Sequence, residues 1–357
     1  MNQNPYASML EMFMHPVFLV KDGIITDVNQ SAKDHQISTG TKVSDFIVNG
    51  LEEYEAHSGI CLSLTLRFCD CEYIASVFRQ DQWDVFQISS AYGSSDLKAI
   101  ALAAKHLRGP LANTMVTADR LFPNPALGSD DTAQKQIRQI NRNLYQLLRT
   151  INNMADASGG VYALSENRQI MDAVSIFREI MKRTTEMAKQ ANRKLEFKGP
   201  KQKIYCLTNQ HTLERAVYNL ISNAIKFSPD GSRITATLVK KGDKLLFSIE
   251  NPCENLNSES IKTIFSRYQR QPGTEDSRHG LGLGIRIVQN AASIHGGALL
   301  LEQPAEDTIR FTMTISLKQD HQINVRTPAI TILPGGYDEA LVELSEILPE
   351  SYFGNIN

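Results

Sequence analysis

Hydrophobic and polar positions alternate with a period of two along much of residues 1–95. The alternation is clearest in residues 62–68, 73–78 and 83–88. Such a pattern is typical of strands that bury one face of an antiparallel sheet. Two more apolar runs flank Lys21-Asp22-Gly23, a sequence that favours a tight hairpin turn. Because the segment 29–51 reads as short helices and loops, we expect an N-terminal domain built on an antiparallel sheet.

The pattern changes after Ser95 to apolar positions spaced by three and four residues, which is typical of packed helices. The first series is Leu97, Ile100, Ala104, Leu107, Leu111, Thr114, Ala118 and Leu121. The second series is Ile137, Ile140, Leu144, Leu147, Ile151 and Met154. Turn residues separate the two series, and Ser158-Gly159-Gly160 ends the second. A helical hairpin with one apolar seam cannot bury that seam alone, so we expect two copies to form a four-helix bundle in a homodimer.

Helical and strand patterns are mixed from residue 162 to about residue 317. Predicted helices cover residues 172–192 and 212–227, and a further helix follows residue 285. Predicted strands cover residues 203–207, 234–239, 245–249, 298–301 and 309–315. This order predicts an α/β sandwich with helices on one face of a mixed sheet. The whole chain is therefore expected to be an α+β multidomain protein.

Composition narrows the expected surroundings and partners. The chain has 357 residues and a formal net charge of −2, so no overall charge favours nucleic acid. Its longest apolar runs are far shorter than the roughly 20 residues of a membrane span, and the N-terminal residues lack the pattern of a secretory signal. Five scattered cysteines fit a reducing compartment. We therefore expect a cytoplasmic protein without membrane insertion. Cys69 and Cys71 are interpreted as ordinary residues of an alternating strand.

Three pieces of the last α/β region carry candidate chemistry. Asn219, Asn223 and Lys226 are spaced i, i+4 and i+7 and share one helix face, which suits a cation and a phosphate. Residues 280–285 alternate glycine with apolar residues before a predicted helix, so that backbone amides can approach a phosphate. Residues 265–277 combine arginines with a polar stretch, which is typical of a mobile loop over a nucleotide.

In order and spacing, these pieces resemble the asparagine box, the phenylalanine box and the second glycine box of sensor histidine kinases, which are GHKL ATPases. With the preceding helical hairpin, which resembles the family's dimerisation and phosphoacceptor domain, the resemblance covers about residues 96–317. It implies a signalling protein of a two-component system that binds ATP and Mg²⁺ and has a response regulator as partner. It also implies roles for individual residues. Asn223 would ligate Mg²⁺ with Asn219 beside it, Lys226 and Arg270 would face the phosphates, and Gly280, Gly282 and Gly284 would wrap them.

The N-terminal pattern resembles a PAS domain. The strand–turn–strand opening of such domains often carries the sequence pattern found here at Asp22-Gly23-Ile24 and Val28-Asn29. The resemblance implies a domain that senses a small ligand or mediates dimer contacts.

The first glycine box of the family, D-x-G-x-G, is altered here. Its ungapped equivalent is residues 251–255, with Asn251 in place of the aspartate and with Cys253 and Asn255 in place of the glycines. The Asn251 amide oxygen can still accept a hydrogen bond from the adenine amino group, although more weakly than a carboxylate. We therefore expect adenine binding to be weakened.

The phosphoacceptor position is also altered. Against the family pattern H-E-L-R-x-P-L, counting back from Pro110 places His106 at the glutamate and Lys105 at the histidine. One residue on a helix is a turn of about 100°, so His106 points in another direction than the usual acceptor. Both residues lie off the apolar seam and should be exposed. A neutral imidazole remains a competent nucleophile near pH 7, so His106 is a candidate catalytic phosphoacceptor.

Three functions remain open at this level. The first is an active histidine kinase that transfers phosphate from ATP to His106 and on to a response regulator. The second is a pseudokinase that binds ATP or a partner as a dimeric regulatory module, and the third is an interaction protein with a vestigial pocket. His279 is a weaker candidate for a phosphate contact, and His295 reads as a helix-end residue.

The expected domains are residues 1–95 (PAS-like), 96–160 (helical hairpin), 161–318 (ATP-binding) and 319–357 (C-terminal tail). The tail contains a predicted strand at residues 328–334 and a predicted short helix at residues 337–348. Because an apolar strand and helix must be covered, we expect the tail to pack on its own chain or on the dimer partner.

Overall fold

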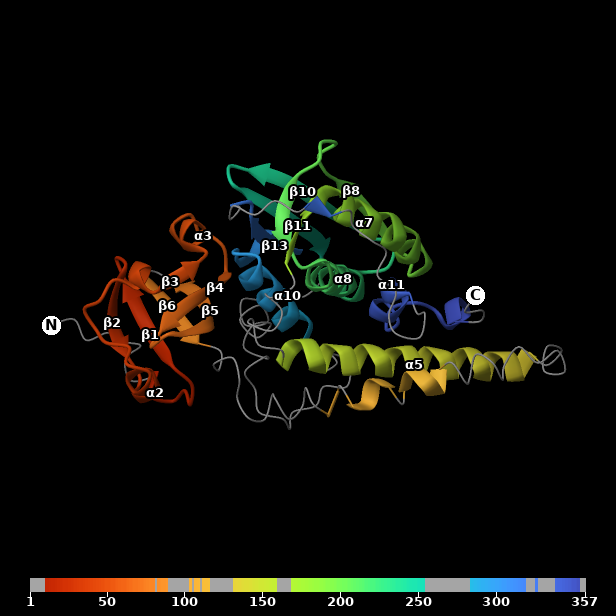
Figure 1. Cartoon of the computed structure of the whole chain (residues 1–357), viewed down its shortest axis with the longest axis horizontal. Helices are drawn as coiled ribbons and strands as arrows, with labels where there is room; N and C mark the ends of the chain where they lie inside the picture. Colours follow the sequence, from red (N-terminus) through yellow and green to blue (C-terminus); the bar gives the residue numbers. More distant parts are fainter. Residues whose placement is uncertain are drawn as a thin grey trace.

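The computed structural model describes residues 10–80, 82–88, 103–104, 106–109, 111–115, 131–158, 168–253, 283–318, 325–326 and 338–353. Figure 1 shows an N-terminal group of strands, a larger group of strands and helices, and the long helix α5 (Asp131–Ser158) along one side.

The N-terminal group is the expected antiparallel sheet. Its strands are β1 (Val17–Lys21), β2 (Ile24–Val28), β4 (Cys61–Phe68), β5 (Cys71–Gln80) and β6 (Trp83–Ile88), in the spatial order β2-β1-β6-β5-β4. Between β2 and β4 lie the short elements α2 (Gln30–Asp34), η1 (Val43–Asp45), β3 (Ile47–Asn49) and α3 (Leu51–Glu55). Asp22 and Gly23 both have positive φ, 51° and 74°, so the predicted hairpin turn is confirmed.

A second tight turn corrects the interpretation of the cysteine pair. Cys69 and Asp70 join β4 to β5 with φ of 48° and 61°, the left-handed backbone of a two-residue hairpin turn. Cys69 therefore lies in the turn and not in an alternating strand. The sequence pattern concealed this because cysteine is an unusual turn residue. Within the described part of the chain, no cluster of three or more His, Cys, Asp or Glu could hold a metal ion.

The larger group is an α/β sandwich, as predicted. Its strands are β8 (Lys194–Lys198), β10 (Arg233–Lys241), β11 (Lys244–Pro252), β12 (Leu299–Ala305) and β13 (Thr308–Ser316), in the order β8-β10-β11-β13-β12. The sheet is mixed because β8 and β10 are parallel while the other pairs are antiparallel. The helices of this sandwich are α7 (Ala173–Gln190), α8 (Gln210–Phe227) and α10 (Leu283–Ile294).

A small second sheet joins β7 (Gln169–Asp172), β9 (Tyr205–Thr208) and β14 (Val325–Arg326). The predicted strand at residues 203–207 is β9, and it pairs in this small sheet. Strands β7 and β8 had not been predicted because each is only four or five residues long.

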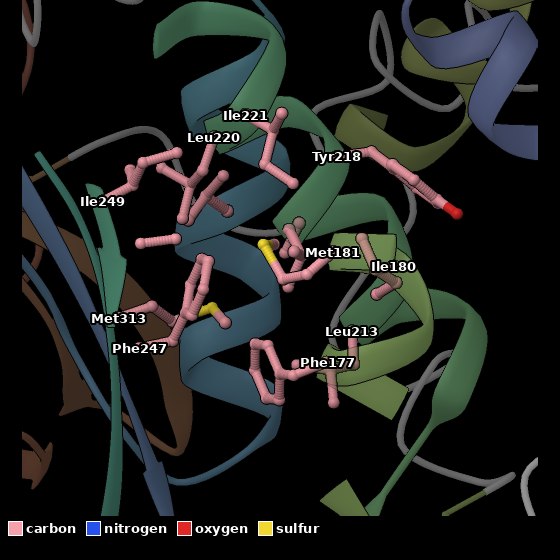
Figure 2. Close-up of a cluster of buried hydrophobic side chains, with 14 of the residues drawn as sticks. Phe177, Ile180, Met181, Leu213, Tyr218, Leu220, Ile221, Phe247, Ile249 and Met313 are labelled. Carbon is pink, nitrogen blue, oxygen red and sulfur yellow. The ribbon is translucent and has the colours of Figure 1, made fainter. Parts of the chain in front are cut away.

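The core of the sandwich lies between the helices and the sheet (Figure 2). Phe177 of α7 packs on Phe247 of β11 with ring centroids 4.8 Å apart. Tyr218 of α8 is buried with its hydroxyl pointing away from this cluster. Leu213, Leu220 and Ile221 of α8 are buried in the same cluster. Their burial determines which face of α8 remains available for a ligand.

The two groups of strands form one continuous sheet. The edge strand β4 pairs antiparallel with β12, with Cys61, Leu62 and Ser63 opposite Leu301, Leu300 and Leu299. Polar contacts reinforce the junction. The Thr65 and Ser293 hydroxyls are 2.7 Å apart, and Glu53 accepts hydrogen bonds from Lys244 at 2.6 Å and from Thr314 at 2.7 Å. The N-terminal sheet is thus attached directly to the sandwich.

Helix α5 uses one face for contacts within the chain. Tyr145, Leu148 and Arg149 are buried on that face. The face packs on α10, on α11 (Glu339–Glu343) and on η4 (Glu350–Phe353). Three residues of the predicted seams are exposed: Ile140 by 44%, Leu147 by 52% and Leu107 by 55%. Of the predicted first helix, residues 103–104, 106–109 and 111–115 are helical, and the rest lies outside the described residues.

The described part of the tail packs on its own chain. Leu344, Leu348 and Phe353 are fully buried and join the core of the sandwich. Helix α11 ends at Glu343, so the regular helix is shorter than predicted. The predicted strand at residues 328–334 lies outside the described residues. None of the helices that the structure describes has the length and apolar character to cross a membrane.

Candidate functional site

Helix α8 is well capped and deeply buried, and one side of it, the asparagine face, carries Asn219 and Asn223. The helix begins after Asn209, whose side chain accepts a hydrogen bond from the Thr212 amide at 3.1 Å. Asn219 is 1% exposed and its amide nitrogen donates to the Arg215 carbonyl at 2.8 Å. Asn223, one turn later, is partly exposed. The helix therefore presents two amides next to each other, one fixed and one accessible.

The start of α10 lies directly against these asparagines. A Cβ atom added at Gly284 would be 2.8 Å from Asn219 Oδ1 and 3.8 Å from Asn223 Nδ2. Two of the three pieces singled out in the sequence, separated by about 60 residues, thus meet in space as expected. Only a residue without a side chain allows this approach between the helices.

His295 joins the other end of α10 to the start of α8. Its Nε2 accepts from the Thr208 hydroxyl at 2.8 Å and from the Asn209 amide at 3.3 Å, and its Nδ1 donates to the Ala291 carbonyl at 2.7 Å. Complete burial lowers the pKa of His295 to about 4. His295 is a helix-end residue as expected, but its neutral ring also connects the two helices of the candidate site. No local motif indicates this contact.

Asn251, the candidate adenine contact, lies near the end of β11 opposite Ile309 of β13. It is 3% exposed, and its amide nitrogen donates to the Pro252 carbonyl at 2.9 Å. The other candidate residues Arg270, Gly280, Gly282 and His279, the phenylalanine-box segment 265–277, and Asn255 all lie outside the described residues.

Lys226, the candidate phosphate contact on α8, is paired with the tail. Its Nζ is 3.0 Å from the Glu346 carboxylate. Arg149 of α5 also contacts Glu346 at 3.0 Å and donates to the Ser222 hydroxyl at 2.9 Å. Sequence reasoning missed this arrangement because its partners are roughly 75 to 200 residues apart and share no motif.

His106, the candidate phosphoacceptor, is helical and exposed, as expected for a position off the seam. Lys105 lies outside the described residues.

Comparison with known proteins agrees with this arrangement. Residues 208–319 match the family of histidine kinase-, DNA gyrase B- and HSP90-like ATPases. The chain is 27% identical over 197 residues to the sensor protein KdpD of Clostridium acetobutylicum, covering 54% of this chain and 21% of that protein. It is 23% identical over 227 residues to the sensor histidine kinase WalK of Bacillus subtilis, covering 62% and 37%. The chain thus spans less than half the length of these relatives.

Solved structures of histidine kinases are also similar. Full-length ShkA in complex with AMPPNP aligns with a TM-score of 0.48 at 15% identity, covering 61% of this chain and 45% of that one. The kinase ThkA in complex with the response regulator TrrA aligns with a TM-score of 0.40 at 17% identity, covering 87% and 98%.

The sandwich and the asparagine and glycine elements define a GHKL-type ATPase domain over residues 208–319. Residues 208–319 thus match the histidine kinase-, DNA gyrase B- and HSP90-like ATPases, and a larger part of the chain is similar to sensor histidine kinases.

Proposed function

We propose that this chain binds ATP with Mg²⁺ between the asparagine face of α8 and the start of α10. The observation that supports the proposal is the close approach of Gly284 to Asn219 and Asn223. Amide oxygens are suitable ligands for Mg²⁺, and a helix N-terminus favours phosphate. Both features occur together here at the start of a helix of 12 residues.

In this proposal Asn223 ligates Mg²⁺, and Asn219 lies beside Asn223. Bound Mg²⁺ would neutralise charge on the nucleotide phosphates. The backbone of Gly280, Gly282 and Gly284 wraps the phosphates, with Arg270 and Lys226 as their cationic contacts. Asn251 accepts a hydrogen bond from the adenine amino group.

The remaining regions have roles in signalling. Residues 1–95 are a PAS-like sensor domain, and the strand order β2-β1-β6-β5-β4 supports this assignment. Residues 96–160 form the dimerisation hairpin. The exposed seam residues Leu107, Ile140 and Leu147 support burial in a four-helix bundle with a second copy. The ATP-binding domain spans residues 161–318, and the tail spans residues 319–357.

ATP binding at this site is compatible with two functions. In the first, the chain is a sensor kinase that autophosphorylates on His106 and passes the phosphoryl group to a response regulator. Exposure of His106 supports this function. In the second, the chain is a pseudokinase that regulates through ATP or partner binding alone. Lys105, which occupies the usual acceptor position, supports that function.

Titration calorimetry of the full chain with Mg²⁺-ATP tests the binding site. Asn223→Ala should abolish measurable binding because the variant removes the proposed metal ligand. The matched control is Asn143→Ala, which truncates an exposed asparagine on α5 and should leave the affinity unchanged. Absence of binding by the unsubstituted chain, or equal binding by the Asn223 variant, would contradict the proposal.

Incubation with γ-labelled ATP separates the two functions. Acid-labile label that is lost in His106→Ala identifies a kinase with a shifted acceptor. ATP binding without label identifies a pseudokinase.

A further inference from the structure

The C-terminal segment 338–353 carries acidic side chains that meet basic side chains of α5, α7 and α8. Its ion pairs are Asp338 with Arg183 at 2.9 Å, Glu339 with His211 at 3.4 Å, Glu343 with Arg215, Glu346 with Lys226 and Arg149 at 3.0 Å each, and Glu350 with Arg142 at 3.8 Å. We call this segment the acidic tail.

The centre of this contact is buried. The side chains of Arg215, Glu343 and Arg149 are 2%, 0% and 6% exposed. A buried charge is costly unless an opposite charge lies beside it, so these arginines require an anionic neighbour. Glu343 and Glu346 of the acidic tail supply it, together with Asp156 of α5 beside Arg215. Together with Lys226, the two arginines therefore form a built anion-binding site on α5 and α8.

The carboxylate of Glu346 is stabilised as an anion by this site. Burial alone would raise its pKa, but Arg149 and Lys226 outweigh that effect and the pKa of Glu346 is lowered. Glu346 thus stays charged at neutral pH beside the two cations.

This anion site adjoins the asparagine face. Lys226 follows Asn223 by three residues and shares its side of α8. Ser222, which accepts the hydrogen bond from Arg149, is the residue next to Asn223. The Glu346 carboxylate therefore pairs with Lys226, the cation that a nucleotide phosphate would contact at this position.

We propose that the acidic tail places an anion in the phosphate-binding part of the nucleotide site, where Glu346 competes with ATP for Lys226. The inference rests on the proposed ATP site. Attachment to the same chain gives the carboxylate a high effective concentration. Leu344, Leu348 and Phe353 keep the segment anchored in the core. Replacement of Glu346 by a phosphate at Lys226 therefore requires only a local movement. The Glu346 side chain is 34% exposed and can turn outward while its neighbours stay in place.

The test compares Mg²⁺-ATP affinities of the full chain and its Glu346→Gln variant by calorimetry at fixed ionic strength. A partly exposed ion pair contributes little, so removal of the competitor should tighten ATP binding by roughly two- to fivefold. Glu346→Asp keeps the charge but shortens the side chain, and it should also tighten binding. Inorganic tripolyphosphate, used as a probe of the phosphate side alone, should show the same order of affinities.

Glu350→Gln is the matched control. It makes the same change of charge on the same segment, but its partner Arg142 lies on α5 away from the asparagines. Its affinity for ATP should equal that of the unsubstituted chain. The melting temperature of each variant verifies that it is folded.

Equal affinities of the unsubstituted, Glu346→Gln and Glu346→Asp chains would overturn the inference and leave the proposed ATP site intact. A similar gain in Glu350→Gln would also overturn it, since a general charge effect would then suffice. If neither the unsubstituted chain nor the Glu346 variants bind ATP, the proposed function fails and the inference fails with it.

Discussion

The backbone of α10 comes so close to α8 that position 284 has no room for a side chain. The limiting atom is Asn219 Oδ1, which belongs to a buried amide already held by its bond to the Arg215 carbonyl. Any Cβ at this position must therefore move either Asn219 or the start of α10. Both movements would alter the candidate phosphate and metal contacts.

We expect Gly284→Ala to weaken Mg²⁺-ATP binding by about tenfold, because overpacking of this kind costs about 1–2 kcal/mol. Calorimetry measures the change. Gly109→Ala is the matched control, since a Cβ at Gly109 meets no atom within 4 Å. Unchanged affinity in Gly284→Ala would show that the close approach has no role in binding.

His295 gives the fold a dependence on pH. Its pKa is about 4 in the folded protein and 6.5 as a free side chain, so the unfolded chain binds the extra proton more readily. Its contribution, on the order of 3 kcal/mol, is fully present above pH 6.5 and is lost as the pH falls towards 4. Protonation of Nε2 also removes the acceptor for Thr208 and for Asn209 at the start of α8.

Urea unfolding at several pH values measures this dependence. The unsubstituted chain should lose stability steeply between pH 6.5 and 4, and His295→Gln should lose less over the same range. Burial also lowers the pKa of His57 to about 4. The pH dependence of stability that His57 contributes therefore remains in the variant. Identical pH profiles of the two chains would contradict the role of His295.

At this scale the sequence predicts some contacts and misses others for a physical reason. The spacing of Asn219 and Asn223 on one helix turn is a local property, so their shared face could be predicted. Glu346 beside Lys226 and His295 beside Asn209 are long-range contacts between residues without a motif. Such pairs depend on how the elements pack, which one sequence does not reveal.

Among the elements, α8 is held between the sheet on one side and the acidic tail with α5 on the other. The tail contributes the fully buried Glu343, which pairs with Arg215 in the first half of α8. Arg215 also contacts Asp156 of α5 at 2.7 Å. The ion pairs thus connect three elements that are distant in sequence.

Glu343→Gln should lower the free energy of unfolding by about 2–3 kcal/mol, because it leaves the buried Arg215 and Arg149 with one anion fewer. Urea unfolding followed by circular dichroism measures the loss. Glu186→Gln breaks an exposed pair with Lys189 and should change stability little. A loss in Glu343→Gln no larger than in this control would contradict the importance of the buried contact.

The elements were predicted best where the pattern was long and strongly periodic. Helices α7 and α8 and strands β10, β11 and β13 match their predicted ranges within a few residues. The short strands β7 and β8 were missed, and the predicted tail helix is regular only over Glu339–Glu343. Short elements are stabilised by tertiary contacts more than by local sequence, so their patterns are weak.

At the scale of the whole molecule, the junction between β4 and β12 makes one sheet of the two groups of strands. Glu53 of α3 strengthens the junction, because its side chain is 7% exposed and bonds both Lys244 and Thr314. Sequence patterns did not predict this junction. Either strand could have been an edge, and backbone pairing between two edges leaves no signature in the side chains.

The shared sheet should make both groups unfold in one transition. Trp83 of β6 is the sole tryptophan of the chain, so its fluorescence reports on the N-terminal sheet, while far-ultraviolet circular dichroism reports on all helices. The two urea curves should coincide.

Glu53→Lys, which opposes Lys244 with a like charge, should separate the two curves. Glu55→Lys on the exposed side of the same helix should not. Separate curves in the unsubstituted chain would show that the junction does not couple the two groups.

The pairing of β4 with β12 also limits how this protein can be recombined. A chimera that exchanges residues 10–88 for an unrelated domain would keep the chain connected. It would nevertheless leave the outer edge of β12 with unpaired N–H and C=O groups, a template for association with other chains. A functional exchange must therefore supply a strand in place of β4, so residues 10–88 and the ATPase domain are interchangeable only among proteins that share this edge.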